Sequence, residues 1–338
     1  MWTMKVLVRV PNWIGDSVLA RPAIEAISSH FSGGEVWLGA ADPVQDLFAF
    51  DSGIAGVLPL PPVKDIKSLQ AAARRLKKER FETGILLTNS FGSALLFFLA
   101  GIPERWGYST DGRKPLLTKA VRRMNPDSPR HHVHYYLDLI SRLGLTTRPP
   151  ELRLSVPPEE KERARQRLRA LGVDPLRPLV ILSPGASYGP AKRWPASRFA
   201  RLAALFQERD DAAVLIIGSA GEAEIASAIV SSLEKKPPVL TGQTTLPQLA
   251  SLISLASCFV TNDTGPMHLA NALRVPVVAI FGPTDPAVTG PFERPAAVLK
   301  KDVPCWPCHY RSCPYDHRCM TKIEPEEVYQ AARKLERS

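Results

Sequence analysis

The chain repeats one pattern, in which short apolar runs rich in valine, isoleucine and leucine alternate with amphipathic segments of helix length. This pattern constrains the fold most, because it is typical of βα units, in which the strands of a parallel sheet alternate with helices. In the first half we expect strands at Lys5–Val10, Glu35–Ala40, Ile54–Leu58 and Ile85–Thr88. The expected helices are Ser17–Phe31, Pro43–Phe50, Asp65–Arg80 and Phe91–Ala100.

The same alternation of apolar runs and amphipathic segments occurs again in the second half of the 338 residues. Prolines and charges over Arg148–Asp174 indicate a linker around a charged helix. The sequence therefore predicts two doubly wound, Rossmann-like α/β domains that face each other across a cleft, over residues 1–165 and 175–323, followed by a C-terminal helix at 324–338. The second-half strands are expected at Leu179–Ser183, Ala213–Ile217, Val239–Thr241, Cys258–Thr261 and Val277–Phe281.

Composition excludes several classes of protein. With 45% hydrophobic and 22% charged residues the chain lies in the globular range, which excludes disorder and fibres. The uncharged stretch Thr83–Pro103 is interrupted by polar residues, so we expect no transmembrane helix. The first ten residues hold a lysine within a short apolar run and no cleavage site, which predicts a cytoplasmic protein.

The net charge of +10 favours acidic partners. Residues 105–130 hold seven Lys or Arg against two acids, and His131, His132 and His134 follow directly. This concentration suits anionic groups, although a solvated basic face explains it equally well. A noncatalytic nucleic-acid-binding protein is a further interpretation, but no aromatic stacking stripe or known docking motif supports it.

Two familiar phosphate-binding fingerprints are absent from the sequence. Neither GxxxxGK[ST] nor GxGxxG occurs, which disfavours a P-loop NTPase and a nicotinamide-dependent dehydrogenase. In open α/β sheets, ligands bind beyond the carboxyl ends of the strands. The loops expected there, each entering a helix, are Pro11–Asp16, Ser183–Pro195, Gly218–Glu222 and Asn262–His268.

The segment Thr261–Gly265 follows an apolar strand and opens a helix, whose free N–H groups and dipole form an anion site. Gly265 would let a phosphate approach the backbone, and Thr264 could add a hydroxyl donor. Lys192 could meet the same phosphates. The alternatives are that Asp263 or Thr264 only caps the helix, and that Lys192 is a solvated surface lysine.

Asp16, in the first βα loop, is a candidate general base, with a helix N-cap as the alternative role. Glu222 follows a buried strand and could accept hydrogen bonds from ribose hydroxyls. No Asp-x-Asp pair occurs that would hold a divalent metal on a nucleotide diphosphate. Leaving-group charge would then be met by lysine, backbone and helix dipole.

Four cysteines stand within fifteen residues of a proline-rich segment, with His309 and His317 among them. A structural zinc ion is the leading interpretation, because four thiolates would hold together a loop that lacks a core. Free thiols, redox disulfides and an iron–sulfur cluster remain alternatives. Cys258, inside an apolar run, is expected to be a small buried hydrophobe. The four are Cys305, Cys308, Cys313 and Cys319.

These motifs, in this order, resemble the ADP-heptose:lipopolysaccharide heptosyltransferases of glycosyltransferase family 9 over nearly the whole chain. The resemblance rests on Val10–Asp16, Pro184–Pro195, Thr261–His268 and Phe281–Asp285. The loop before Trp194 is the version of the second heptosyltransferase subgroup rather than the first. The resemblance implies a GT-B architecture, with an N-terminal acceptor domain and a C-terminal ADP-sugar domain, and an inverting transferase without a catalytic metal.

Residue by residue, the resemblance makes Asp16 the catalytic base and Lys192 the phosphate-binding lysine. Glu222 would lie near the adenosine ribose, and Ser187 aligns with a further donor-binding residue. The sugar and diphosphate would be held by Asp263, Thr264, Gly265 and His268.

The implied donor is ADP-L-glycero-D-manno-heptose, and the implied acceptor is the phosphorylated inner core of lipopolysaccharide. A different nucleotide sugar or core acceptor is the alternative within the family. The enzyme would meet its lipid-linked acceptor at the cytoplasmic face of the inner membrane, through amphipathic and basic segments such as Asp65–Arg80. For that helix an ordinary solvated surface is the preferred alternative. The residues expected near the acceptor are Arg105, Arg113, Arg130, His131 and His132.

Overall fold

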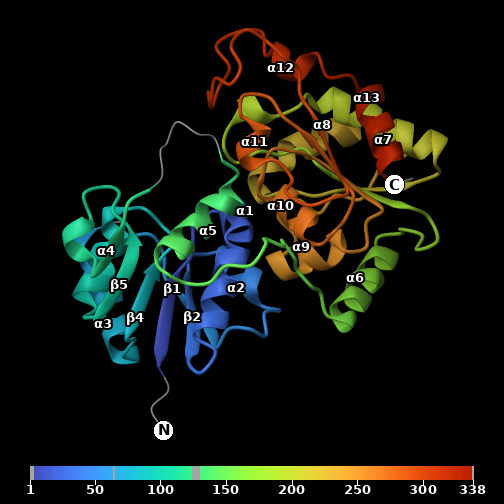
Figure 1. Ribbon diagram of the computed structural model, residues 1–338. Helices are drawn as coiled ribbons and strands as arrows, with labels where there is room; N and C mark the ends of the chain where they lie inside the picture. Colours follow the sequence, from blue (N-terminus) through green and yellow to red (C-terminus); the bar gives the residue numbers. More distant parts are fainter. Residues whose placement is uncertain (1–3, 64, 124–129, 337–338) are drawn as a thin grey trace. The chain divides into compact units, whose positions relative to one another are not determined.

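The computed structural model describes residues 4–63, 65–123 and 130–336 (Figure 1). The chain divides into two compact units, Met1–Glu151 and Leu152–Ser338, each built on its own parallel sheet. The expected pair of α/β domains is therefore confirmed. The first unit ends before the predicted limit at residue 165, because helix α6 (Pro158–Ala170) packs against α9 (Leu246–Ile253) of the second unit.

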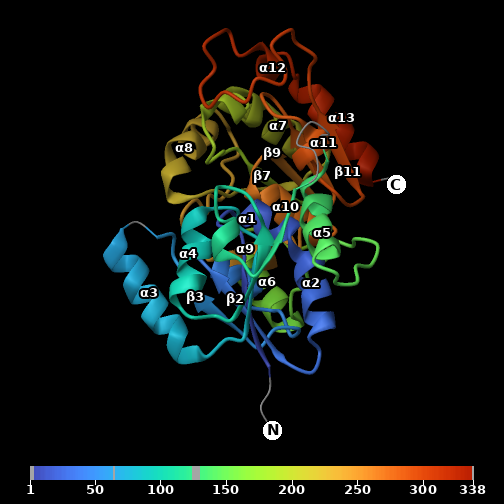
Figure 2. The ribbon, with the colours of Figure 1, turned by 60° about the vertical axis from the view of Figure 1, so that its left-hand side comes forward.

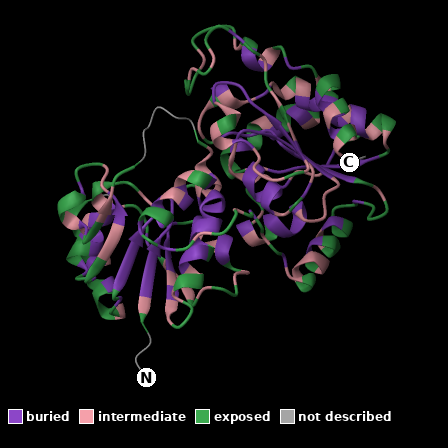
Figure 3. Cartoon of the chain, in the orientation of Figure 1, coloured by how far each residue is buried: buried purple, intermediate pink, exposed green. Residues whose placement is uncertain are grey.

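The first unit contains a six-stranded parallel sheet with the order β3-β2-β1-β4-β5-β6. Its central strands, β1 and β4, are buried along nearly their whole length (Figure 3). Two of the strands were not predicted, because their sequences, Glu-Arg-Trp-Gly-Tyr and Lys-Ala-Val, lack an apolar run. The strands are β1 Lys5–Arg9, β2 Glu35–Ala40, β3 Gly56–Pro59, β4 Thr83–Leu86, β5 Glu104–Tyr108 and β6 Lys119–Val121.

Helices lie on both faces of this sheet, with α3 and α4 on one face and α1, α2 and α5 on the other (Figures 1 and 2). The helix predicted over Ser17–Phe31 is two helices that meet at Ala20, directly before the Arg-Pro pair that opens the second. The one predicted over Pro43–Phe50 is a short 3₁₀ helix. The elements are α1 Ile14–Leu19, α2 Arg21–His30, η1 Val44–Phe48, α3 Ile66–Glu79, α4 Phe91–Leu99, η2 Lys114–Leu116 and α5 His132–Arg142.

The second unit contains a five-stranded parallel sheet with the order β11-β10-β9-β7-β8. The strand predicted at Val239–Thr241 is wrong: Val239 forms only an isolated bridge with Ile216. One strand was missed at Ala296–Leu299, which pairs with β10 at the edge of the sheet. The strands are β7 Leu179–Ser183, β8 Ala213–Ile216, β9 Cys258–Asn262, β10 Val277–Ile280 and β11 Ala296–Leu299.

In this unit α7, α8 and α13 pack on one face of the sheet around a core that includes Trp194 and Phe199. The predicted C-terminal helix is α13, which lies against α7 and the strands β10 and β11 (Figure 2). The remaining elements are η3 Pro190–Lys192, α7 Ala196–Arg209, η4 Ala220–Glu222, α8 Ala223–Ser231, α10 Gly265–Ala272, α11 Pro286–Thr289, α12 Arg318–Thr321 and α13 Pro325–Glu336.

The order of the second sheet decides which loops meet. Strand β9 lies between β7 and β10, and β8 pairs with β7 on its other side. Because parallel strands end at the same edge, the loops after Ser183, Ile216, Asn262 and Ile280 gather there. No helix among the described residues is both long and apolar enough to cross a membrane.

Helix α4 offers a matched test of the first core. Leu96 is 2% exposed within the cluster between the sheet and helices α3 and α4, whereas Leu99, one turn later, is 44% exposed. Leu96→Ala should lower the free energy of unfolding by about 2–5 kcal/mol through cavity formation, and Leu99→Ala by about 1 kcal/mol or less. Urea denaturation measures both; equal losses would contradict this packing.

Candidate active site

The second unit gathers two polar side chains around a carboxylate at the end of β9. Asp263 is 5% exposed, and its carboxylate contacts the Lys192 ammonium and accepts a 2.6 Å hydrogen bond from the Thr284 hydroxyl. Lys192 comes from the loop after β7 and Thr284 from the loop after β10. Lys192 is therefore the partner of a buried carboxylate, and the solvated lysine considered from the sequence is wrong.

Asn262, the residue before Asp263, connects the end of β9 to the loop that follows β7. It is fully buried; its side-chain amide donates to the carbonyl oxygens of Pro184 (2.7 Å) and Gly185 (3.2 Å). Its side-chain oxygen accepts from the Trp194 backbone N–H at 3.1 Å. Sequence analysis missed this role, although a polar residue ending an otherwise apolar strand is a signal for it.

Helix α10 begins directly beside the carboxylate. Thr264 is its N-cap by backbone geometry, but the described structure gives its side chain no hydrogen bond to the first turn. Asp263 is engaged with Lys192 and Thr284 instead. The capping alternative is thus not supported, and the N-terminal end of α10, with its partial positive charge, lies beside the Lys192–Asp263 pair. His268, one turn on, is buried.

Glu222 lies against the loop that follows β7. Its carboxylate accepts a 2.7 Å hydrogen bond from the Ser219 backbone N–H in a capping box at the start of η4. A Cβ at Gly185 would lie only 1.9 Å from the Glu222 carboxyl group, so a larger residue there would displace the Glu222 side chain. The structure brings the predicted Glu222 beside the loop that leads to Lys192. Ser187, on the same loop, is exposed.

The cysteine-rich segment is hydrogen-bonded to the loop that carries Lys192. Ala191 donates its N–H to the Arg311 carbonyl at 3.0 Å, and its own carbonyl lies 2.7 Å from the His317 imidazole. The Tyr188 hydroxyl donates to the His309 carbonyl at 2.6 Å. The Tyr188 ring, 4.8 Å from the Lys192 ammonium, connects these contacts to the site. The segment therefore supports the position of Lys192.

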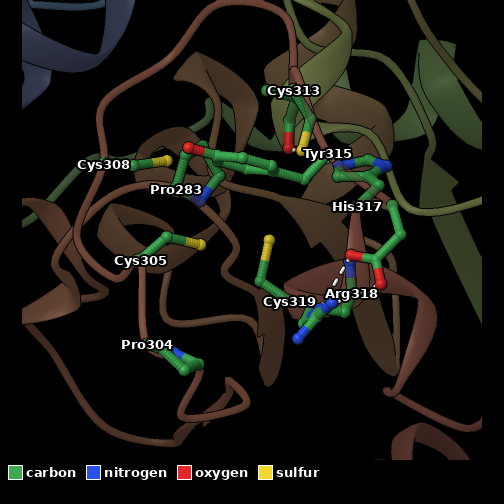
Figure 4. Close-up of a pocket in the computed structure, with 11 residues that line it drawn as sticks. Pro283, Pro304, Cys305, Cys308, Cys313, Tyr315, His317, Arg318 and Cys319 are labelled. Atoms are coloured by element: carbon green, nitrogen blue, oxygen red, sulfur yellow. Dashed lines mark hydrogen bonds and ion pairs between the residues drawn. The ribbon is translucent and has the colours of Figure 1, made fainter.

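All four cysteines of the segment line one cavity of about 260 Å³ (Figure 4). The sulfur atoms of Cys305 and Cys319 point into the space between them. Burial, together with the neighbouring thiols, raises the pKa of the Cys319 thiol to about 11. As these side chains stand, the described residues contain no group of three or more His, Cys, Asp or Glu that could hold a metal ion. Cys258 is a buried strand residue, as predicted.

The first unit pairs Asp16 with His132. Asp16 lies in the first turn of α1, whose N-cap is Trp13, so the N-cap alternative for Asp16 is wrong. Its Oδ1 is 3.2 Å from Nδ1 of His132, the first residue of α5. The preceding loop is held by a 2.7 Å hydrogen bond from the buried Arg9 to Asn12. Both members of the pair stay accessible, with side chains 30% and 37% exposed.

Two of the arginines predicted near the acceptor donate hydrogen bonds to backbone carbonyl oxygens. Arg113 is fully buried and donates to the carbonyl oxygens of Tyr108 and Thr88, and burial lowers its pKa to about 10. Arg105 donates to the carbonyl oxygens of Ile102, Pro103 and Leu116. Both guanidinium groups bind the backbone of the turns around β5. A surface role for Arg113 is wrong because that side chain is fully buried, whereas Arg105 is only half-buried and its acceptor role stays a prediction.

The other predicted acceptor residues separate into two places. Arg130 and His131 line an open hollow of about 660 Å³, together with His134 and Arg148. His132, the residue between them, contacts Asp16 instead. The hollow is bordered by two arginines, two histidines and one carboxylate, Asp138, and the basic side chains outnumber the acidic one, which suits anionic groups.

Comparison with known proteins shows the family. A model described as glycosyltransferase family 9 (heptosyltransferase) matches residues 69–318. Lipopolysaccharide heptosyltransferase 2 of Escherichia coli is 30% identical over 311 residues, covering 88% of each chain. Lipooligosaccharide heptosyltransferase 2 of Campylobacter jejuni is 28% identical over 339 residues, covering 98% of this chain and 99% of its own.

A solved structure gives the same result for the fold. The structure of E. coli ADP-heptose lipopolysaccharide heptosyltransferase II matches with a TM-score of 0.86 and 28% identity, covering 98% of both chains. The two parallel-sheet α/β domains are thus those of the GT-B heptosyltransferase structures. The chain belongs to glycosyltransferase family 9 and is a glycosyltransferase.

Proposed function

We propose that this enzyme is an inverting heptosyltransferase that moves heptose from ADP-L-glycero-D-manno-heptose to the inner core of lipopolysaccharide. The observation that carries the proposal is the group formed by Lys192, Asp263 and Thr284 beside the start of α10. A fixed ammonium and the positive end of a helix suit a nucleotide diphosphate. The relatives named as lipopolysaccharide heptosyltransferases support the sugar and the acceptor.

The proposed chemistry is a single displacement. A core hydroxyl oxygen forms a bond to the anomeric carbon while the bond from that carbon to ADP breaks, which inverts the configuration. The electron pair leaves with the ADP phosphate, whose charge is met by Lys192 and the backbone N–H groups at the start of α10. This charge compensation by the chain's own groups is why we propose a metal-independent reaction. Asp16 serves as the general base that removes the hydroxyl proton.

The donor and acceptor sites are assigned to different units. We assign Ser187, Glu222, Thr264, Gly265 and His268 to the donor site together with Lys192 and Asp263. Glu222 would meet the ribose, and its place against Gly185 supports this. Arg130 and His131, at the hollow of the first unit, are the acceptor-side residues that the geometry favours.

Two variants separate binding from chemistry. Asp16→Asn should lower kcat by about 10²–10⁴-fold with donor affinity nearly unchanged, because the amide cannot support proton removal. Lys192→Ala should weaken ADP-heptose binding as well, because it removes the fixed ammonium beside the diphosphate. Mass-resolved turnover with purified ADP-heptose and a defined core acceptor measures kcat, and calorimetry measures donor binding.

Lys192→Ala also leaves a buried carboxylate unpaired, which costs about 3–5 kcal/mol of stability. The double variant Lys192→Ala/Asp263→Asn controls for this, since it restores stability without restoring donor binding. Wild-type turnover in Asp16→Asn would exclude the assigned base. Faster transfer from another nucleotide sugar in a donor competition assay would favour the alternative within the family.

We further propose that the four clustered cysteines hold a structural zinc ion. Four thiols line one cavity, and the segment they belong to has few apolar residues of its own. Because the side chains as they stand do not converge on one point, zinc binding would require the thiols to turn inward. A metal there would stabilise the contacts of this segment with Tyr188 and Ala191.

Metal analysis of the purified chain should find one zinc ion per chain. Cys305→Ser and Cys319→Ser should each lose the metal, whereas Cys258→Ala, which changes the fifth cysteine, should keep it. Chelation should weaken donor binding, because the Lys192 loop loses its support. Metal-free protein with four reactive thiols or with disulfides would contradict the proposal, as would protein that contains iron and shows an iron–sulfur absorption spectrum.

We also propose peripheral association with the cytoplasmic face of the inner membrane through α3. This helix exposes five basic side chains, and Ile66 at its start is 72% exposed. Each lysine or arginine near an anionic bilayer contributes about 1 kcal/mol of attraction. The basic side chains are Lys67, Arg74, Arg75, Lys77 and Lys78.

Sedimentation with phosphatidylglycerol vesicles tests this association. The variant Lys77→Glu/Lys78→Glu should reduce binding at least tenfold, because it reverses two charges on the exposed face of α3. The variant Lys235→Glu/Lys236→Glu is the matched control, since it makes the same change at an exposed lysine pair of the second unit. Equal losses for both variants, or equal binding to neutral vesicles, would contradict a specific role of α3.

A further inference from the structure

We infer that Thr284 is a positioning residue for the sugar of the donor: it holds one oxygen of Asp263 so that the other oxygen accepts a hydrogen bond from a sugar hydroxyl. The inference rests on the proposed transfer from a nucleotide sugar and names the part of the donor that this carboxylate recognises. Thr284 lies in the loop after β10, 21 residues beyond Asp263 in the sequence.

The two oxygens of the Asp263 carboxylate have different surroundings. Oδ2 contacts the Lys192 ammonium and accepts the 2.6 Å hydrogen bond from Oγ1 of Thr284. Oδ1 has no hydrogen-bond partner among the residues that the structure describes, and it is not sealed off from solvent. Oδ1 is therefore the oxygen that is left for a ligand.

The negative charge restricts what Oδ1 can meet. An ionised carboxylate oxygen accepts hydrogen bonds and repels the phosphate oxygens of a nucleotide diphosphate. A neutral hydroxyl donates to it, and a hydrogen bond to a charged acceptor is stronger than one between neutral groups. The diphosphate fits Lys192 and the start of α10 instead. Because Glu222 is assigned to the ribose, the hydroxyl at Oδ1 belongs to the transferred sugar.

Thr284 keeps the carboxylate from turning. The carboxyl group of an aspartate rotates readily about its last bond, which exchanges the two oxygens. Lys192 alone permits this rotation, because an ammonium on a flexible stem is a point charge that can follow either oxygen. The Thr284 hydroxyl has one hydrogen on a β-branched side chain with restricted χ1, so its bond selects one oxygen and one orientation.

Thr284 is itself held by the cysteine-rich segment. Its side chain is buried, and its carbonyl oxygen accepts a 3.2 Å hydrogen bond from the Trp306 indole N–H. The neighbouring Pro283 carbonyl accepts from the backbone N–H groups of Cys308 at 3.1 Å and His309 at 3.0 Å (Figure 4). The segment thus supports both loops whose side chains meet at Oδ2 of the carboxylate.

The decisive variant is Thr284→Val, which removes the hydroxyl and keeps the shape of the side chain. Calorimetry should show about tenfold weaker binding of ADP-heptose, with ADP binding within twofold of the wild type, because only the sugar contact depends on the orientation of Oδ1. Thr284→Ser, which keeps the hydroxyl, should restore the preference for ADP-heptose over ADP. Thr118→Val is the matched control, since it removes a 2.9 Å hydrogen bond to the Glu104 carboxylate in the first unit and should leave that preference unchanged.

A double variant separates positioning from direct contact with the ligand. In Asp263→Asn the single amide oxygen pairs with Lys192, so no acceptor is left for the sugar. Adding Thr284→Val to this variant should then change ADP-heptose binding by less than about twofold. A further loss in the double variant would show that Thr284 contacts the ligand itself, which would overturn the positioning role.

Folding and the proposed function are checked separately. Thermal unfolding of each variant detects loss of the fold, and Thr284→Ala removes the same hydroxyl with less bulk if the valine disturbs the loop. An unchanged preference for ADP-heptose in either folded variant would overturn the inference. If the wild type binds ADP but not ADP-heptose, the proposed function fails instead, and the same preference is measured with the nucleotide sugar that the wild type does bind.

Discussion

The buried carboxylate of Asp263 is the interaction on which the second unit's site depends. A carboxylate that is 5% exposed needs a charged partner and hydrogen bonds, and it obtains them from Lys192 and Thr284. Satisfying this one group requires the loops after β7 and β10 to close on the end of β9. Asn262 adds a second tie between the same strand end and the loop after β7.

This requirement gives the cysteine-rich segment a purpose beyond its own folding. The Lys192 loop contains Gly189 and Pro190 and forms only a short 3₁₀ turn, so local structure alone does not hold it. The hydrogen bonds to Arg311, His309 and His317 supply the missing support from a distant part of the chain. The Arg311 backbone can approach this loop closely because Gly189 has no side chain. A Cβ at Gly189 would lie only 2.4 Å from the Arg311 carbonyl oxygen.

The two proposed chemical groups share one design. In each, a carboxylate on the first residues of a helix or at a strand end holds a nitrogen from a distant loop or helix: Lys192 for Asp263, and His132 for Asp16. The reaction then needs no large rearrangement of charged groups, which is the condition for electrostatic stabilisation of a transition state.

Much of the fold could be predicted from the sequence, because buried strands of parallel sheets are continuous apolar runs and β1, β2, β7, β9 and β10 have them. Edge and polar strands could not be predicted, since Glu104–Tyr108, which lacks an apolar run, becomes a strand by pairing with β4 and β6. Val239–Thr241 shows the opposite error, an apolar run that gains a single bridge.

By itself the sequence determined where the functional loops begin, because apolar strands end at Asn262, Ser183 and Arg9 and the polar motifs follow at once. Only the tertiary structure decided which side chains meet. Lys192 and Asp263 are 71 residues apart, and Asp16 and His132 are 116 apart; strand order and helix packing, not local spacing, bring them together. The tertiary structure also decided that the Arg113 side chain is enclosed by backbone carbonyl groups. The sequence shows that Arg113 is basic, like the other residues predicted near the acceptor, but charge alone does not specify the direction in which a side chain points.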